Sequence, residues 1–158
     1  MYKKILVPLD GSELAECVLH QVESVAKGCS AESVTFLRVA EPVHIPVSGE
    51  YDGYTFNAKD WQQMETELKA AAEHYLNQLL SRVKYDGIKT QSVVMSGRAA
   101  ESIAEYANKN GVDLIAIATH GRSGISRWVW GSVADRVLRS ASVPVLMIRA
   151  PGYLPGSI

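Results

Sequence analysis

The feature that most constrains the fold is a regular alternation of short apolar runs with segments of helical periodicity. Five runs are rich in β-branched residues, and they cover residues 5–7, 34–39, 92–95, 114–118 and 145–148. Runs of this length that are bounded by turn residues predict β-strands. Segments whose apolar residues recur at helical spacing lie between them, so strands and helices alternate along the chain.

The helical segments predict helices that cover both faces of a sheet. Three apolar stripes consist of Leu14, Val18, Val22 and Val25, of Trp61, Met64, Leu68, Tyr75, Leu79 and Val83, and of Ile103, Ala104 and Ala107, the last ended by Gly111. A fourth helix begins at Ser132, which with Asp135 resembles a capping box, and stops before Pro144. Strands that alternate with helices pair in parallel, and continuous apolar strands indicate helices on both faces. The predicted class is therefore α/β, with a doubly wound parallel sheet.

Length and charge exclude several classes of protein. The chain has 158 residues, with 16 Lys+Arg and 17 Asp+Glu, and this length fits one domain, predicted over residues 1–150 with a flexible tail at 151–158. Without a basic excess, nucleic-acid binding is not expected to be the main task. No apolar stretch reaches the roughly 18 residues of a membrane span, and no signal peptide begins the chain. We therefore expect a cytoplasmic protein without a membrane partner.

Residues 41–60 interrupt the alternation of strands and helices. They include Pro42, Pro46, Gly49 and Gly53, and they predict a long loop or lid. Two interpretations stay open, because a loop of this length is often functional but a mobile surface insertion fits equally well.

The most informative stretch follows the fourth predicted strand. It contains Gly121 and Gly124 and ends at Gly131 and Ser132, where a helix begins. The glycines allow close approach of the backbone, and the first amides of the helix have no partners within it. A phosphate there would meet these amides, the positive end of the helix dipole and a guanidinium from Arg122 or Arg127. The stretch predicts an anion-binding loop, with an ordinary Gly-rich turn before a capped helix as the alternative.

The first strand supplies a complementary segment, because Pro8, Leu9 and Asp10 lead from its carboxyl end into a helix. Open parallel sheets bind ligands beyond the carboxyl ends of their strands, where the winding reverses. Asp10 can accept hydrogen bonds from ribose hydroxyls, or it can cap the helix. His120 lies in the same candidate site, where it either contacts the ligand or holds the loop through a backbone hydrogen bond.

Several other chemistries fail on spacing. The chain contains no GxxxxGK[ST], and no GxGxxG follows a strand. A nucleophile elbow would need Gly where Ile125 stands. No metal-ligand spacing occurs among the four histidines or between them and the two cysteines, which are His20, His44, His74, His120, Cys17 and Cys29. We therefore predict no metal-ligating and no catalytic residue.

Five segments together resemble the universal stress protein family, and they span nearly the whole chain: residues 3–12, 113–115, 119–124, 131–134 and 144–146. The ATP-binding branch of that family carries a Gly, two residues, a second Gly, nine residues, and Gly-Ser or Gly-Thr. Here the second Gly is Gly121 and the final pair is Gly131 and Ser132. Ala118 stands in place of the first Gly, and its methyl group adds bulk where the nucleotide and the backbone meet.

The resemblance implies a fold, a ligand and a set of contacts. The fold is the Rossmann-like, adenine nucleotide alpha hydrolase-like sheet of five parallel strands in the order 3-2-1-4-5. ATP would bind between the first and fourth strands, with adenine against Pro8 and Val39, ribose near Asp10 and any Mg or Mn held mainly by the phosphates. The predicted ligand-binding residues are Pro8, Leu9, Asp10, Val39, Ala118, His120, Gly121, Arg122, Gly131, Ser132, Val133 and Ala134.

By the same resemblance, the protein is a stress-response switch whose state depends on bound ATP. The family commonly forms homodimers through the last strand, here Val145, Leu146, Met147 and Ile148, and an unpaired apolar edge strand favours such association. Three alternatives stay open: a nucleotide-free interaction module that works through its homodimer, a slow ATPase, and a flavin-binding protein of similar topology. The sequence offers no evident general base for the enzymatic alternative.

Overall fold

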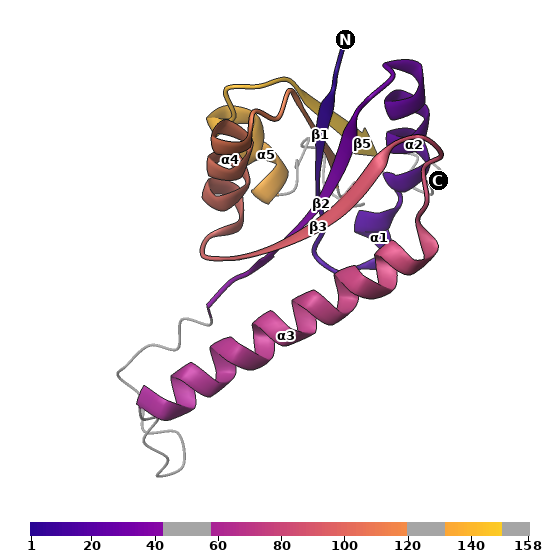
Figure 1. The fold of residues 1–158 in the computed structure, drawn as a ribbon. Coiled ribbons are helices and arrows are strands. Elements are labelled where there is room, and N and C mark those ends of the chain that lie inside the picture. The colour runs from indigo at the N-terminus through magenta and orange to yellow at the C-terminus, as the bar shows by residue number, and fades with distance from the viewer. Residues whose placement is uncertain (43–57, 120–131, 150–158) are drawn as a thin grey trace, which may run out of the picture.

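The computed structural model describes residues 1–42, 58–119 and 132–149, and their central feature is a five-stranded sheet (Figure 1). The strands are β1 (Lys4–Pro8), β2 (Ser33–Ala40), β3 (Lys89–Ser96), β4 (Leu114–Thr119) and β5 (Val145–Arg149). All neighbours pair in parallel, and the order across the sheet is β3-β2-β1-β4-β5. The predicted class and strand order are confirmed.

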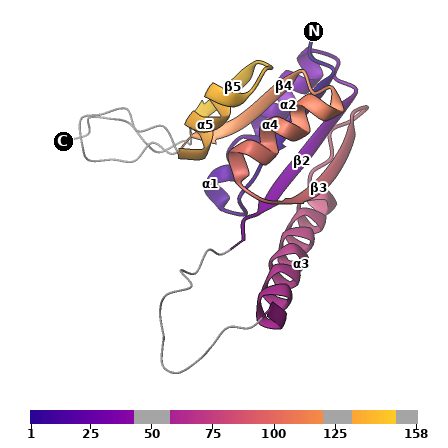
Figure 2. The same cartoon turned by 90° about the vertical axis from the view of Figure 1, so that its left-hand side faces the viewer.

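Helices cover both faces of the sheet (Figure 2). They are α1 (Glu13–Glu16), α2 (Leu19–Gly28), α3 (Ala58–Arg82), α4 (Ala99–Asn110) and α5 (Ser132–Ser140). The helices α1, α2 and α3 pack on one face, and α4 and α5 pack on the other. Although α3 has 25 residues, none of the helices in the described ranges is both long and apolar enough to cross a membrane.

Two apolar layers, one on each face, explain why the strands are continuous apolar runs. In β1, Ile5 and Val7 join the layer beneath α2 and α3, whereas Leu6 joins the layer beneath α4 and α5. Phe36 of β2 is fully buried in the first layer. Successive side chains of a strand point to opposite faces, so a strand that is covered on both sides is mostly apolar in its middle.

The first predicted helix is in fact two, and this part of the prediction is wrong. The chain turns at Cys17, whose N–H donates to the carbonyl oxygen of Leu14, three residues back, at 3.3 Å. Leu14 is 38% exposed and does not belong to the buried stripe, whereas Val18 and Val22 are fully buried. A bond to the third residue back tightens the turn and rotates the start of α1 away from the core.

Two predicted boundaries need comment. The helix α3 already begins at Ala58, so the last three residues of the loop predicted over 41–60 are helical, with Asp60 in the first turn, where an acidic side chain favours the helix dipole. The rest of that loop, residues 43–57, and the predicted tail at 151–158 lie outside the described residues.

A carboxylate fixes β1 beside β4 at the amino-terminal edge of the sheet. The backbone N–H groups of Lys3 and Lys4 donate to the two carboxylate oxygens of Asp113, at 2.8 and 3.1 Å. This sets the register in which Ile5 lies opposite Leu114. As a consequence, the carboxyl ends of β1 and β4 emerge side by side at the opposite edge, where doubly wound sheets bind their ligands.

Candidate ligand-binding site

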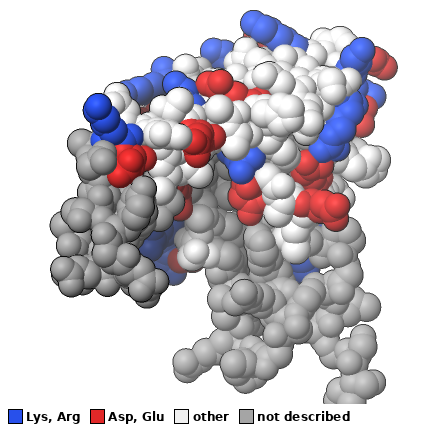
Figure 3. Space-filling view, turned by 90° about the horizontal axis from the view of Figure 1, so that it is seen from below, with Lys and Arg blue, Asp and Glu red and all other residues white. Residues whose placement is uncertain are grey.

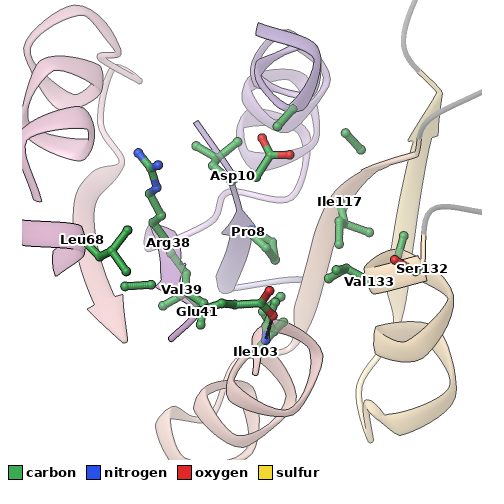
Figure 4. A pocket seen from close by; sticks show the side chains of 17 residues that line it. Pro8, Asp10, Arg38, Val39, Glu41, Leu68, Ile103, Ile117, Ser132 and Val133 are labelled. Carbon is green, nitrogen blue, oxygen red and sulfur yellow. Dashed lines mark hydrogen bonds between the residues drawn. The ribbon is translucent and has the colours of Figure 1, made fainter. Parts of the chain in front are cut away.

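A cavity of about 690 Å3 opens at the carboxyl ends of β1, β2 and β4 (Figure 4). The segments that line it come from β1 and the turn after it, from the end of β2, from β4 and from the start of α5. One residue each of α1 and α3 and two residues of α4 complete the wall: Ala15, Leu68, Ala99 and Ile103. The cavity therefore lies at the point where the crossovers leave the sheet toward opposite faces.

Eight of the twelve residues predicted to bind a ligand line this cavity. They are Pro8, Leu9, Asp10, Val39, Ala118, Ser132, Val133 and Ala134. The remaining four, His120, Gly121, Arg122 and Gly131, lie outside the described residues. The topology thus brings together two segments from opposite ends of the chain, and the contacts of these residues with a ligand stay a prediction.

Asp10 serves the helix start as well as the cavity. Its Oδ1 accepts hydrogen bonds from the backbone N–H of Ser12 at 2.8 Å and from the Ser12 hydroxyl at 2.6 Å. The hydroxyl oxygen of Ser12 in turn accepts the N–H of Ala15 at 3.1 Å and caps α1. The turn between them passes through Gly11, whose φ of +87° disfavours any side chain. The helix is therefore capped by Ser12 and not by Asp10, which supports the cap through Ser12, and the same bonds orient an exposed carboxylate at the cavity wall.

The side chain of Ala118 is mostly buried in the core. It lies in β4 opposite Ile148 of β5, and it is 8% exposed. It belongs to the same apolar layer as Ala15 of α1. Because little of Ala118 is exposed, the methyl group that replaces the family's first glycine adds little bulk to the cavity.

Replacing Ala118 by Gly should therefore lower the stability of the protein without weakening the binding of a ligand. The lost methyl group and the extra backbone freedom of glycine in a strand together predict a fall of about 1–2 kcal/mol in the free energy of unfolding. The affinity for ATP, the ligand predicted from the sequence, should stay equal or rise. Urea unfolding and titration calorimetry measure the two quantities, and an affinity lowered tenfold or more would contradict this account of Ala118.

Sequence reasoning missed two charged residues of the cavity, Arg38 and Glu41. Arg38 is the one cationic side chain among the described lining residues. Glu41 accepts the N–H of Ala99, the first residue of α4, through its Oε1 at 2.7 Å. Arg38 could have been noticed as a charged residue within the apolar run of β2. The sequence does not show, however, which residues its side chain contacts.

A polar network lies behind Arg38. The Cζ of Arg38 is 4.9 Å from the centre of the Tyr75 ring, and the Tyr75 hydroxyl donates to Oε1 of Glu16 at 2.9 Å. Glu16 is also paired with Arg82. Burial, and next the hydrogen bond to Glu16, raise the pKa of Tyr75 above its usual range, so the hydroxyl keeps its proton and remains a donor.

Elsewhere at this end of the molecule the described surface has mixed charge. Acidic and basic side chains are interspersed over the described part of the face (Figure 3). Within the three described ranges, no group of three or more His, Cys, Asp or Glu side chains could hold a metal ion.

Known proteins resemble this chain along most of its length. The model of the Universal stress protein family matches residues 1–149. Universal stress protein MJ0531 of Methanocaldococcus jannaschii is 31% identical over 154 residues, which cover 96% of this chain and 84% of that protein. Universal stress protein MJ0577 of the same organism is 30% identical over 94% of this chain and 96% of its own length.

Solved structures agree with the fold. The structure of MJ0577 aligns with a TM-score of 0.76 and 28% identity over 97% of this chain and 99% of that one. A universal stress protein of Arabidopsis thaliana, solved with AMP bound, aligns with a TM-score of 0.61 over 95% of this chain and 93% of that one. Its identity is 17%, so the likeness shows the fold alone.

Proposed function

The chain belongs to the universal stress protein family, and on that premise we propose that it binds an adenine nucleotide, above all ATP, in the cavity at the ends of β1, β2 and β4. The observation that carries the proposal is that one cavity is lined both by Asp10 and by the first residues of α5. A ribose partner and a phosphate partner are thus available in a single space. The family to which the chain belongs includes an Arabidopsis protein solved with AMP bound, and AMP is a ligand of the proposed class.

The cavity suits a nucleotide in size and in the nature of its walls. Small-molecule sites measure about 300–1,000 Å3, and this one is about 690 Å3. Apolar side chains, among them Val39, Leu68 and Ile117, line the region that we assign to adenine, next to Pro8. Asp10 lies where a carboxylate can accept the ribose hydroxyls.

We assign the phosphates to the start of α5. The first four N–H groups of a helix have no partner within it and point toward its positive end, which favours an anion. Ser132, Val133 and Ala134 provide these groups at the cavity wall. The family pattern extends this contact to His120, Gly121, Arg122 and Gly131. A Mg2+ or Mn2+ ion that accompanies ATP would be held mainly by the phosphates.

The nucleotide would act as a switch in a cytoplasmic stress-response protein. Glu41, which directly follows β2, and Leu68 of α3 both line the cavity. A ligand would therefore contact both the residue after β2 and α3, and its binding would alter the surface that the protein offers to a partner. The strand β5 lies at the edge of the sheet, and we propose that it pairs with a second copy of the chain.

The decisive experiment asks whether the purified protein carries or binds an adenine nucleotide. The protein is denatured, and released small molecules are identified by mass spectrometry. The nucleotide-free protein is then heated with ATP, ADP or AMP. At about 100 times Kd the ligand should add about 2.7 kcal/mol to the free energy of unfolding and raise the Tm by several degrees.

The outcomes separate the alternatives. Near-stoichiometric release of adenine nucleotide, or a rise in Tm, supports the proposal. No released nucleotide and no change in Tm with any of the three would overturn it and favour a nucleotide-free interaction module. Steady-state release of phosphate from ATP would distinguish a slow ATPase from a switch.

A further inference from the structure

Arg38 lies beneath the turn that carries Asp10. It is near the carboxyl end of β2, where it pairs in register with Val94 of β3, and it lines the cavity. Its side chain extends away from Val39 and Glu41, toward the side of the cavity where Asp10 lies (Figure 4). The sole cation of the described cavity wall is thus close to the segment that we assign to the ribose.

The guanidinium of Arg38 packs directly against Gly11. A methyl group placed on Gly11 would lie 2.8 Å from Nη1 of Arg38 and 3.0 Å from its Cζ. A separation under about 3 Å is closer than carbon and nitrogen atoms pack, so the guanidinium fills the space that a side chain at Gly11 would need. Gly11 also has φ at +87°, a backbone conformation that side chains disfavour, so it is this φ that favours glycine there.

A second contact holds the guanidinium in place. Its Cζ is 4.9 Å from the centre of the Tyr75 ring, within the range of a cation–π interaction. The ring is itself held, because its hydroxyl donates to Glu16 of α1 at 2.9 Å and Glu16 pairs with Arg82 of α3. Arg38 therefore connects the turn after β1 to two helices through contacts that lie outside the cavity.

We infer that Arg38 is a positioning residue for ribose recognition, which supports the turn from Asp10 to Ser12 and so holds the Asp10 carboxylate at the ribose. The inference rests on the proposed function. Gly11 is the most permissive residue of the turn, and the guanidinium packed against it restricts the movement of its neighbour Asp10. The two bonds from Ser12 to Oδ1 of Asp10 then transmit that order to the carboxylate.

The test compares ATP with 2′,3′-dideoxy-ATP, which lacks both ribose hydroxyls. For the wild-type protein, calorimetry should give a Kd for ATP about tenfold lower than for the dideoxy compound, because hydrogen bonds to a charged carboxylate are lost. Asp10→Ala should remove this preference. Arg38→Met keeps the apolar stem but lacks the planar cation. It should also reduce the preference, so that the Kd values for ATP and dideoxy-ATP differ by less than about threefold.

Further variants separate positioning from other roles. The double variant with Arg38→Met and Asp10→Ala should have the same ratio of Kd values for ATP and dideoxy-ATP as Asp10→Ala alone. Both changes act on one interaction, so their effects on this ratio should not add. Arg139→Met is the matched control, since this arginine is exposed and pairs with Asp135 on α5. It should keep the full preference. Urea unfolding of each variant verifies that the compared proteins are folded.

Three results would overturn the inference. In the first, Arg38→Met weakens the binding of ATP and of dideoxy-ATP equally, which indicates a general structural role. In the second, it weakens the binding of ATP far more than that of adenosine, which indicates a direct contact with phosphate. In the third, it leaves the preference for ATP unchanged. If the wild-type protein binds ATP and dideoxy-ATP equally well, the assignment of the ribose to Asp10 is wrong, and if it binds neither, the proposed function itself fails.

Discussion

Val133→Glu is expected to remove about half or more of the stabilisation by ATP while leaving the folded protein as stable as the wild type. Val133 is 37% exposed in the first turn of α5, and it lines the cavity beside the amides to which we assign the phosphates. A carboxylate there would repel the triphosphate and should raise the Kd for ATP at least about tenfold, or about 1.4 kcal/mol. The same carboxylate suits the start of a helix, where it contributes about 0.3–1 kcal/mol of stability.

The matched control for this experiment is Val133→Gln, which has nearly the same shape and no charge. It should keep most of the rise in Tm with ATP. Adenosine, which has no phosphate, should bind the two variants equally, and added salt should narrow the difference between them for ATP. If ATP binds the Glu and Gln variants equally at low salt, the phosphates do not lie at the start of α5.

Phe36→Ala is expected to lower the free energy of unfolding by about 3–5 kcal/mol, because it leaves a cavity in the core. Phe36 is fully buried in β2, and its ring lies edge-on to that of Tyr85, with 6.3 Å between the ring centres. Domains of this size are stable by only about 5–15 kcal/mol, so the variant loses a large part of the total. Urea unfolding at constant temperature measures the loss.

Phe36→Leu is the control for the size of the core change. It keeps an apolar side chain and should cost about 1–2 kcal/mol. Phe36 does not line the cavity, so the folded Phe36→Ala protein should still bind ATP with nearly the wild-type Kd. A loss below about 1 kcal/mol for Phe36→Ala would contradict the packing of β2 beneath α3.

The strands were predictable because their burial requires apolar residues, which are visible in the sequence. Strands covered on both faces are mostly apolar, and each of the five runs lies within a strand of the structure. Helix boundaries were less predictable from the sequence. The break at Cys17 was missed because a tightened turn hardly disturbs the spacing of Val18 and Val22, the two fully buried residues of the predicted stripe. The exposure of Leu14 depends on the rotation of the start of α1 away from the core. The periodicity of the sequence does not predict this rotation.

The candidate site was predictable in part for a similar reason. Parallel strands direct their carboxyl ends to one edge, so the segments after β1 and β4 were expected to meet, and the cavity lined by Asp10 and Ser132 agrees with this. Glu41 was not predictable, because its bond to Ala99 joins the end of β2 to the start of α4. Nothing in the neighbourhood of either residue in the sequence indicates the other.

The sequence by itself determined the alternation of strands and helices, the burial of the sheet on both faces, and the edge at which a ligand would bind. These properties follow from local composition and from the geometry of parallel strands. Only the tertiary structure decided that Arg38 meets Gly11 and Tyr75. The three residues lie on different elements, and their contacts depend on the register of β2 against β1 and on the position at which α3 packs. Both arise from many packing contacts together, which no short stretch of sequence contains.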